Sequence, residues 1–265
     1  MIKNKIGVGI TTYNSEKYFS ALYNSIDKTK VDDIVVVNGG DAYDQEYDCK
    51  WIQHTKNKYP ATCRNECIDY LLNESKCEHI FLIEDDMIIK DSSIFAKYIA
   101  AHNASKLKYF CFVSTSPGAG TPEKRIPRLT VEYSKDVAVS FYRNMCNEFT
   151  YHHASVFSEL GYYDNSEYMR NGFDVDMAFR ESKIGKWAAP FWWFADIKNS
   201  DNYIENNPIA VSRLQSNRAD GSREELIIRT WQYFKEKHGL YVQQIPDTSL
   251  DKVTQFLKQC KQNTL

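Results

Sequence analysis

Three consecutive carboxylates, Glu84-Asp85-Asp86, have the clearest chemical potential in this sequence, and they directly follow an apolar segment at 79–83. Adjacent carboxylates repel one another unless a cation or hydrogen-bond donors neutralise them. Their hard oxygen atoms suit Mg²⁺ or Mn²⁺. A solvated acidic turn is the alternative interpretation, and the triplet alone does not decide between the two.

The elements that must position these acids alternate along the first half of the chain. Apolar segments predict strands at 6–12, 33–37, 51–54, 79–83 and 109–113, and helical periodicity predicts helices at 15–26, 60–73 and 92–104. This alternation predicts a mainly parallel sheet covered by helices on both faces. Ligands bind beyond the carboxyl ends of such strands, which is where the acids lie. Thr11, Thr12 and Tyr13 end the first strand, so they should line a nucleotide pocket, with Tyr13 available to stack on a base.

The second half begins with a loop rich in proline and glycine at 114–127. We expect an antiparallel hairpin at 129–142, a helix at 174–183, a Trp-rich strand near 192–194, and amphipathic helices at 223–237 and 249–261. The five large aromatic side chains at 187–194 are expected to belong to the core. His152 and His153 have no Cys or carboxylate at a matching interval, so packing or acceptor contact is expected rather than metal binding.

Composition limits the function classes. The 33 basic and 35 acidic residues nearly balance, so bulk attraction to nucleic acid or to an anionic membrane is not indicated. No segment is long and apolar enough for a transmembrane span or a signal peptide. Seven scattered cysteines without CxxC spacing favour a reduced, cytoplasmic protein, and Cys63 and Cys67 should be buried on one helix face. The oligomeric state is not predicted.

Three further motifs surround the acids in a fixed order. They are Thr11-Thr12-Tyr13-Asn14 after the first strand, Arg64-Asn65 within a helix, and Phe173-Asp174-Val175-Asp176 at a helix start. With the acidic triplet between the second and third motifs, residues 5–186 resemble family-2-type glycosyltransferases of the GT-A fold. The resemblance implies a mixed, mainly parallel α/β sheet with flanking helices, a small antiparallel acceptor-side part and a helical C-terminal tail.

The resemblance implies metal-dependent transfer of a sugar from a nucleoside-diphosphate sugar, a UDP-sugar, to a hydroxyl of a glycan or glycolipid, with inversion. Asp86 would bind Mn²⁺ or Mg²⁺, and Glu84 and Asp85 would contact the donor or orient the metal's water. Asp174 is the first choice for the catalytic base and Asp176 the second, although either could instead cap the helix.

The donor half would extend over about 1–114 and the acceptor half over about 128–198, which together form one domain at 1–198. A helical extension at 199–265 would pack on that domain. Arg64 could pair with the diphosphate or with an acid of the triplet.

Two departures from the family pattern concern the nucleoside and the metal. Asn38-Gly39-Gly40-Asp41 stands where the family has Asp-Asp-Gly-Ser, so Asn38 and Asp41 are the candidate nucleoside contacts. A histidine that often serves as a late metal ligand has no counterpart at 195–199.

Three rival functions remain. A nucleotidyltransferase would be expected to carry a glycine-rich basic loop after the first strand, where this chain has Thr-Thr-Tyr-Asn-Ser. A glycosyltransferase that modifies nucleic acid, as in phage DNA modification, is left open by the basic segments at 124–128 and 213–223. A non-catalytic module that binds sugar nucleotides would not need both acidic motifs.

Overall fold

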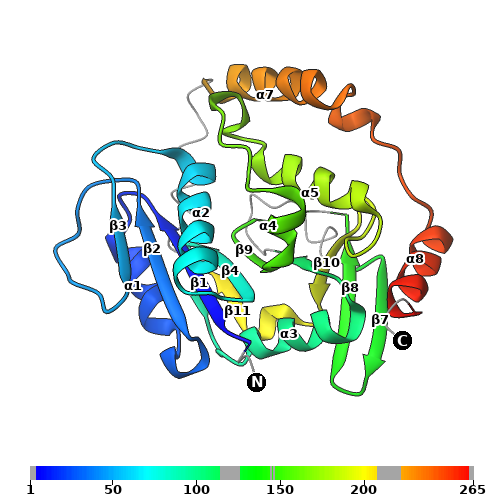
Figure 1. Ribbon diagram of the computed structural model, residues 1–265, viewed down its shortest axis with the longest axis horizontal. Helices are drawn as coiled ribbons and strands as arrows, with labels where there is room; N and C mark the ends of the chain where they lie inside the picture. Colours follow the sequence, from blue (N-terminus) through cyan, green and yellow to red (C-terminus); the bar gives the residue numbers. More distant parts are fainter. Residues whose placement is uncertain (1–3, 114–125, 144, 146, 208–221, 263–265) are drawn as a thin grey trace.

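A six-stranded sheet forms the centre of the computed structural model, which describes residues 4–113, 126–143, 145, 147–207 and 222–262 (Figure 1). Its strand order is β3-β2-β1-β4-β9-β6. The strands are β1 (Ile6–Thr12), β2 (Asp33–Asn38), β3 (Lys50–Gln53), β4 (His79–Glu84), β6 (Tyr109–Cys111) and β9 (Phe149–His153). The first four run parallel, whereas β9 is antiparallel to both β4 and β6. The predicted mixed, mainly parallel sheet is therefore confirmed.

Helices cover both faces of this sheet. Phe19 and Leu22 of α1 (Glu16–Ser25) pack with Val8 and Val36, and α3 (Ile94–Ser105) lies on the same side. On the other face lie α2 (Tyr59–Asp69), its π-helical continuation η2 (Tyr70–Glu74), α4 (Ser155–Leu160) and α5 (Phe173–Ile184). Side chains alternate between the two faces of a strand, so one apolar segment supplies both cores.

The helix α2 lies very close to β1 because two residues of that strand are glycines. A Cβ atom at Gly9 would stand 2.6 Å from Cys67 Cβ, and one at Gly7 would stand 2.6 Å from Leu71 Cδ2. Cys67 is fully buried and Cys63 nearly so, as expected from their spacing. This close packing fixes the start of α2 next to the carboxyl end of β1.

A second, antiparallel sheet has the order β10-β8-β7, from β7 (Leu129–Ser134), β8 (Val137–Tyr142) and β10 (Phe194–Ile197). The hairpin predicted at 129–142 is confirmed. The Trp-rich strand is displaced, because it begins at Phe194 after Trp192, whose φ of 75° is incompatible with a strand. A third pairing joins β5 (Met87–Ile89) to β11 (Ile204–Asn206) just after the acidic triplet.

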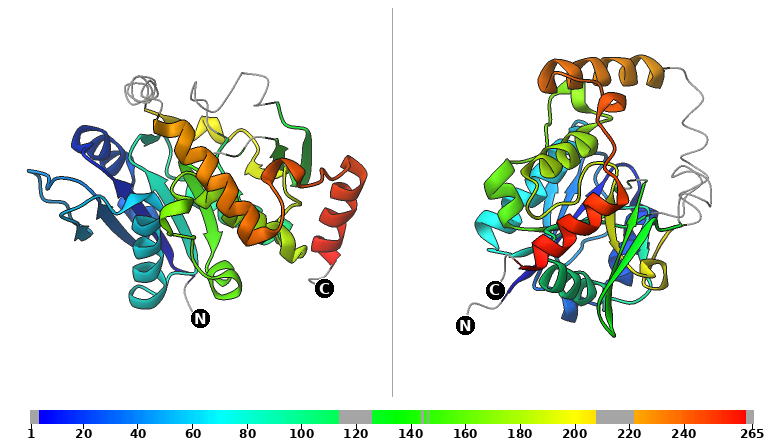
Figure 2. Two further views of the ribbon diagram at one scale, coloured as in Figure 1. Left: turned by 90° about the horizontal axis from the view of Figure 1, so that it is seen from above. Right: turned by 90° about the vertical axis from the view of Figure 1, so that its right-hand side faces the viewer.

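The C-terminal helices lie on the outside of this body, as Figures 1 and 2 show. Phe234 of α7 (Ser222–His238) packs against Phe179 of α5, and α8 (Leu250–Gln262) contributes Val253 and Leu257 to the core beside α3. Short 3₁₀ turns are η1 (Lys28–Lys30), η4 (Glu167–Met169), η5 (Ser200–Asn202) and η6 (Val242–Gln244). No helix within the described ranges combines the length and apolarity needed to cross a membrane.

Candidate active site

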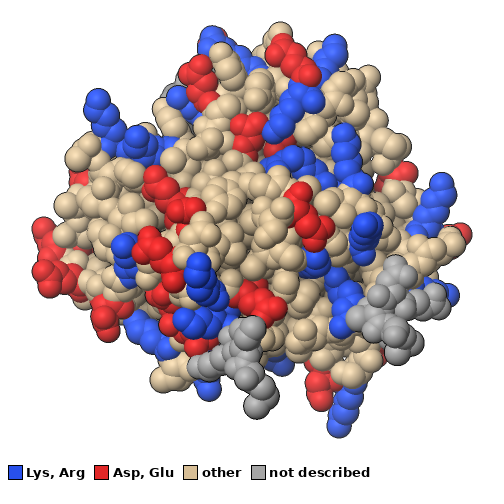
Figure 3. All heavy atoms as spheres, in the orientation of Figure 1, with Lys and Arg blue, Asp and Glu red and all other residues tan. Residues whose placement is uncertain are grey.

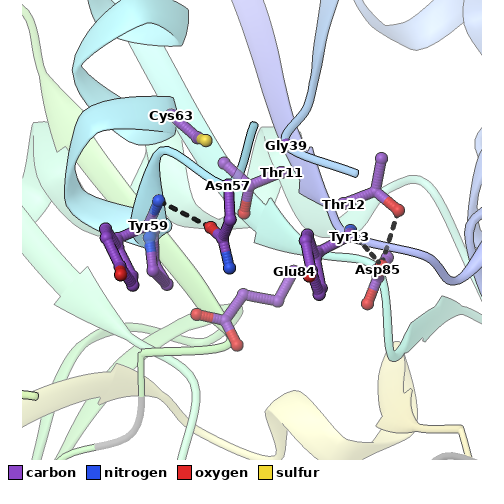
Figure 4. A pocket seen from close by; sticks show the side chains of 10 residues that line it. Thr11, Thr12, Tyr13, Gly39, Asn57, Tyr59, Cys63, Glu84 and Asp85 are labelled. Atoms are coloured by element: carbon purple, nitrogen blue, oxygen red, sulfur yellow. Dashed lines mark hydrogen bonds between the residues drawn. The ribbon is translucent and has the colours of Figure 1, made fainter. Parts of the chain in front are cut away.

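A cavity of about 220 Å³ opens at the carboxyl ends of β1 and β4 (Figure 4). These strands are neighbours, with Thr11 paired to Glu84, so the residues that follow them converge at one edge of the sheet. The residues lining the cavity are Thr11, Thr12, Tyr13, Gly39, Asn57, Tyr59, Pro60, Cys63, Glu84 and Asp85. The structure thus brings together five of the residues predicted from the sequence. The other five lining residues were not predicted; three of them, Asn57, Tyr59 and Pro60, lie just before and at the start of α2, where nothing in the sequence marks a site.

Asp85 holds the two strand ends together. Its Oδ2 accepts hydrogen bonds from Thr12 Oγ1 at 2.6 Å and from the backbone N of Tyr13 at 3.3 Å. Burial raises the pKa of Asp85 to about 6, and these hydrogen bonds oppose that shift. Asp85 therefore fixes the loop that presents the exposed Tyr13 ring to the cavity.

Arg64 lies behind the cavity, where it anchors Glu84. Its side chain is fully buried, and Nη2 donates to Glu84 Oε1 at 2.9 Å while Nη1 donates to Asn147 Oδ1 at 3.1 Å. The rings of Tyr163 and Phe173 flank the guanidinium. Of the two pairings considered for Arg64, the structure contains the one with an acid of the triplet.

The surroundings of Asp86 disfavour the charged form of its carboxyl group. Its Oδ1 is buried and has no hydrogen-bond partner among the described residues. Burial raises the pKa of Asp86 well above its ordinary value, and the nearby charges of Glu84, Glu148 and Asp85 raise it further. Glu148 was not predicted as part of the site, because β9, the strand that it directly precedes, was not predicted. The backbone O of Glu148 accepts a hydrogen bond from Glu84 N at 2.8 Å.

The donor set around Asp86 suits a divalent cation that is also held by a ligand. Within the described parts of the chain, no group of three His, Cys, Asp or Glu side chains could hold a metal ion alone. Mg²⁺ commonly binds through one or two carboxylates together with substrate phosphates and water, and such binding needs no larger protein cage. An uncompensated buried carboxylate oxygen fits that mode.

Asn38 and Asp41 shape the turn after β2 and do not line the cavity. The buried Asn38 amide accepts from Gly40 N at 2.9 Å and donates to Asp41 O at 2.7 Å. The Asp41 side chain is exposed, and its backbone N donates to Asn14 Oδ1 at 2.7 Å. Of this turn, Gly39 is the residue that lines the cavity.

The two candidate bases at the start of α5 have different surroundings. Asp176 is fully buried and bonds to Arg180 Nε at 2.8 Å, Lys237 Nζ at 2.8 Å and His238 Nε2 at 2.7 Å, which links α5 to α7. Asp174 forms no ion pair with a Lys, Arg or His side chain among the described residues; its Oδ1 accepts from Val175 N at 2.9 Å. Neither is the N-cap residue, because that position is Gly172.

The charge environment of Asp174 relates it to the triplet. Burial raises its pKa, the charge of Arg64 opposes the shift and the charge of Glu84 adds to it. Asp174 therefore lies within electrostatic range of the Arg64–Glu84 pair.

The histidines and tryptophans set aside in the sequence have structural partners. His152 and His153 lie on β9, where His152 Nε2 is 3.0 Å from Tyr163 Oη and His153 Nδ1 is 2.8 Å from Ser155 Oγ. Trp187 and Trp193 are buried, as predicted. None of these four residues lines the cavity.

Comparison with known proteins places the fold. No family model and no curated protein sequence matches this chain. Among solved structures, TarS of S. aureus (residues 1–349) superposes with a TM-score of 0.53 over 96% of this chain and 78% of TarS, at 16% identity. This chain has the GT-A fold.

Two further structures are similar to this GT-A chain at lower scores. A second TarS structure matches with a TM-score of 0.49 and 16% identity over 94% of this chain and 46% of the other. The mannosyltransferase PcManGT of Pyrobaculum calidifontis, in complex with GDP-Man and Mn²⁺, matches with a TM-score of 0.48 and 12% identity over 70% of this chain and 54% of the other.

Proposed function

We propose that this protein is a metal-dependent glycosyltransferase that moves a sugar from a nucleoside-diphosphate sugar to an acceptor hydroxyl. The observation that carries the proposal is the Asp86 carboxylate, which lies beside two other acids and whose Oδ1 is buried without a partner in the described residues. A cation shared with a diphosphate would neutralise that charge, and the adjacent cavity is lined by side chains suited to a nucleoside.

Each residue then has a role set by its position. The nucleoside occupies the cavity beside Tyr13 and Gly39, and Glu84 and Asp85 contact the donor. Asp86 is the metal ligand, and when bound the cation would stabilise the charge that develops on the diphosphate leaving group. Asp174 accepts the proton of the attacking hydroxyl, since burial raises its pKa and no Lys or His side chain bonds its carboxylate in the described residues.

The finer assignments are also proposals. A UDP-sugar donor, a glycan or glycolipid acceptor, inversion of the anomeric centre and a cytoplasmic location follow from the sequence motifs and composition. We keep residues 1–198 as the catalytic domain, with 199–265 as an extension. The face in Figure 3 intersperses basic and acidic side chains without a broad area of one sign, so that face does not favour a nucleic-acid acceptor.

The test is a screen of UDP-, GDP- and CMP-sugars for thermal stabilisation and hydrolysis, with Mn²⁺, with Mg²⁺ and with EDTA. A donor at about 100 times its Kd should stabilise the fold by about 2.7 kcal/mol. We expect one nucleotide class to stabilise the protein and to be hydrolysed, with both effects dependent on the metal. The proposal is wrong if no donor binds with either metal.

A further inference from the structure

Tyr59 and Arg170 meet beside the donor cavity and come from different halves of the chain. Tyr59 begins α2 and its ring lines the cavity. Arg170 follows η4 and stands four positions before Asp174. The guanidinium carbon Cζ lies 3.6 Å from the centroid of the Tyr59 ring, which is a close cation–π contact.

The backbone holds Tyr59 in an unfavourable conformation at this point. Its φ is 62°, in the left-handed region of backbone conformation that residues other than glycine rarely adopt. The Tyr59 N–H donates to Asn57 Oδ1 at 2.8 Å, and Asn57 also lines the cavity (Figure 4). Strained residues of this kind cluster at ligand sites, where the surrounding structure over-determines them.

Arg170 has a hydrogen-bonding capacity that the described protein does not use. Its Nε is buried without a partner, and no carboxylate in the described residues forms an ion pair with it. Arg64 and Arg180 differ from Arg170 because each pairs with a carboxylate, that of Glu84 or Asp176, although Arg64 Nε also has no hydrogen-bond partner in the described residues. A half-buried guanidinium with an unused N–H is costly unless an acceptor meets it.

The contact with Tyr59 leaves the N–H groups of Arg170 free to meet a hydrogen-bond acceptor from a ligand. A guanidinium stacked on a ring uses its flat face, so its N–H groups remain available around its edge. That edge suits the paired oxygens of a phosphate. We propose that Arg170 binds the diphosphate of the donor nucleotide and that Tyr59 is the positioning residue that holds the guanidinium in place. This inference rests on the proposed function of the same cavity.

The charges of the site agree with this assignment. Glu84, Asp85 and Asp86 lie together at the end of β4, and Arg64 is already committed to Glu84. A diphosphate placed beside these acids needs cations to neutralise it. One divalent metal held by Asp86 does not neutralise all the negative charge of the diphosphate and the acids together. Arg170 supplies a second, permanent positive charge from the acceptor half of the molecule.

The test compares a nucleoside with its diphosphate by calorimetry, using the base that the donor screen selects. The variants are Arg170→Gln, Arg170→Lys, Tyr59→Phe and Tyr59→Ala, with Arg229→Gln as the control, because Arg229 is an exposed arginine on α7 paired with Glu225. We expect Arg170→Gln to weaken diphosphate binding by about tenfold to a hundredfold, in Mn²⁺ and in EDTA, and to leave nucleoside binding unchanged.

The remaining variants separate the two residues. Arg170→Lys should recover part of the loss, Tyr59→Phe should bind as the wild type does, and Tyr59→Ala should lose affinity mainly for the diphosphate. Equal loss for nucleoside and diphosphate in Arg170→Gln would mean that Arg170 only supports the Tyr59 ring, and an unchanged diphosphate affinity would exclude any contact; either result overturns the inference. If the wild type binds no nucleoside diphosphate, the proposed function itself fails.

Discussion

The guanidinium of Arg64 lies 2.9 Å from Glu84 Oε1, yet the Arg64 side chain has no solvent exposure while a third of the Glu84 side chain is exposed. The pair therefore has a buried cationic end and a carboxylate end that reaches the cavity. A lysine at position 64 could not replace this arginine, because the forked guanidinium bonds the Asn147 amide as well as Glu84. Arg64 thus fixes the first acid of the triplet from behind.

Arg64→Met should destabilise the fold, because it leaves Glu84 without its cation among three acids. Removing one partner of a buried ion pair costs about 3 to 5 kcal/mol, and we expect about 3 kcal/mol since Glu84 is partly solvated. Lys198→Met breaks an exposed pair with Glu132 and serves as the control, for which less than about 1 kcal/mol is expected. Urea denaturation measures both; a loss below about 1 kcal/mol for Arg64→Met would contradict this account.

Buried histidines should make the fold sensitive to acid, and His102 offers a clean test. Burial lowers the pKa of His102 from 6.5 to about 4, and the neighbouring His153, His79 and Lys106 contribute. Between these pH values the unfolded chain binds a proton that the folded chain does not, so stability falls as the pH drops below about 6.5.

The variant His102→Asn keeps a side-chain donor for the carbonyl O of Leu107, which His102 Nδ1 contacts at 2.7 Å. The free energy of unfolding of the wild type falls between about pH 7.5 and pH 5, and in His102→Asn this fall should be smaller by about 1 to 2 kcal/mol. Urea titrations at the two pH values measure this difference, and the packing cost of the substitution cancels in it. An unchanged difference would show that His102 does not titrate on unfolding.

The sequence predicted the half of the site that lies on parallel strands. Apolar segments ending in polar residues marked Thr11, Thr12, Tyr13, Glu84 and Asp85, because in a parallel sheet local pattern and strand direction suffice to place such ends. The antiparallel strand β9 was missed, since its segment mixes Thr, Tyr and His although it lies inside the sheet. Glu148 was missed with it.

Other parts of the site depend on tertiary contacts that no local pattern encodes. Asp176 resembled Asp174 in the sequence, and what separates them is the arrival of Lys237 and His238 from α7, some sixty positions later. Tyr59 and Arg170 are more than a hundred positions apart. The turn at Asn38 to Asp41 was expected to supply side chains, but its amide and backbone groups satisfy one another.

Asp86→Asn should separate stability from metal binding. Because burial and the nearby carboxylates raise the pKa of Asp86, its charge opposes folding at neutral pH, and the neutral variant should be at least as stable as the wild type in EDTA. The same variant should lose at least about tenfold in metal-dependent donor affinity, since even indirect partners of a metal are worth that much.

Thermal melting in EDTA and calorimetry in Mn²⁺ give the two measurements for Asp86→Asn. The exposed Asp44→Asn is the matched control and should change neither. Wild-type donor affinity in Asp86→Asn would remove Asp86 from the metal site.

The two acids at the start of α5 should respond oppositely to amide substitution. Asp174→Asn should keep donor affinity and stability but lower transfer by about a hundredfold to ten-thousandfold, the range that general base catalysis supplies. Asp176→Asn weakens bonds to Arg180, Lys237 and His238, so it should lower the free energy of unfolding by about 2 kcal/mol or more. Donor calorimetry, transfer rates and urea denaturation on both variants separate the two roles. If Asp176→Asn were stable but transferred no sugar, and Asp174→Asn were fully active, Asp176 would be the base.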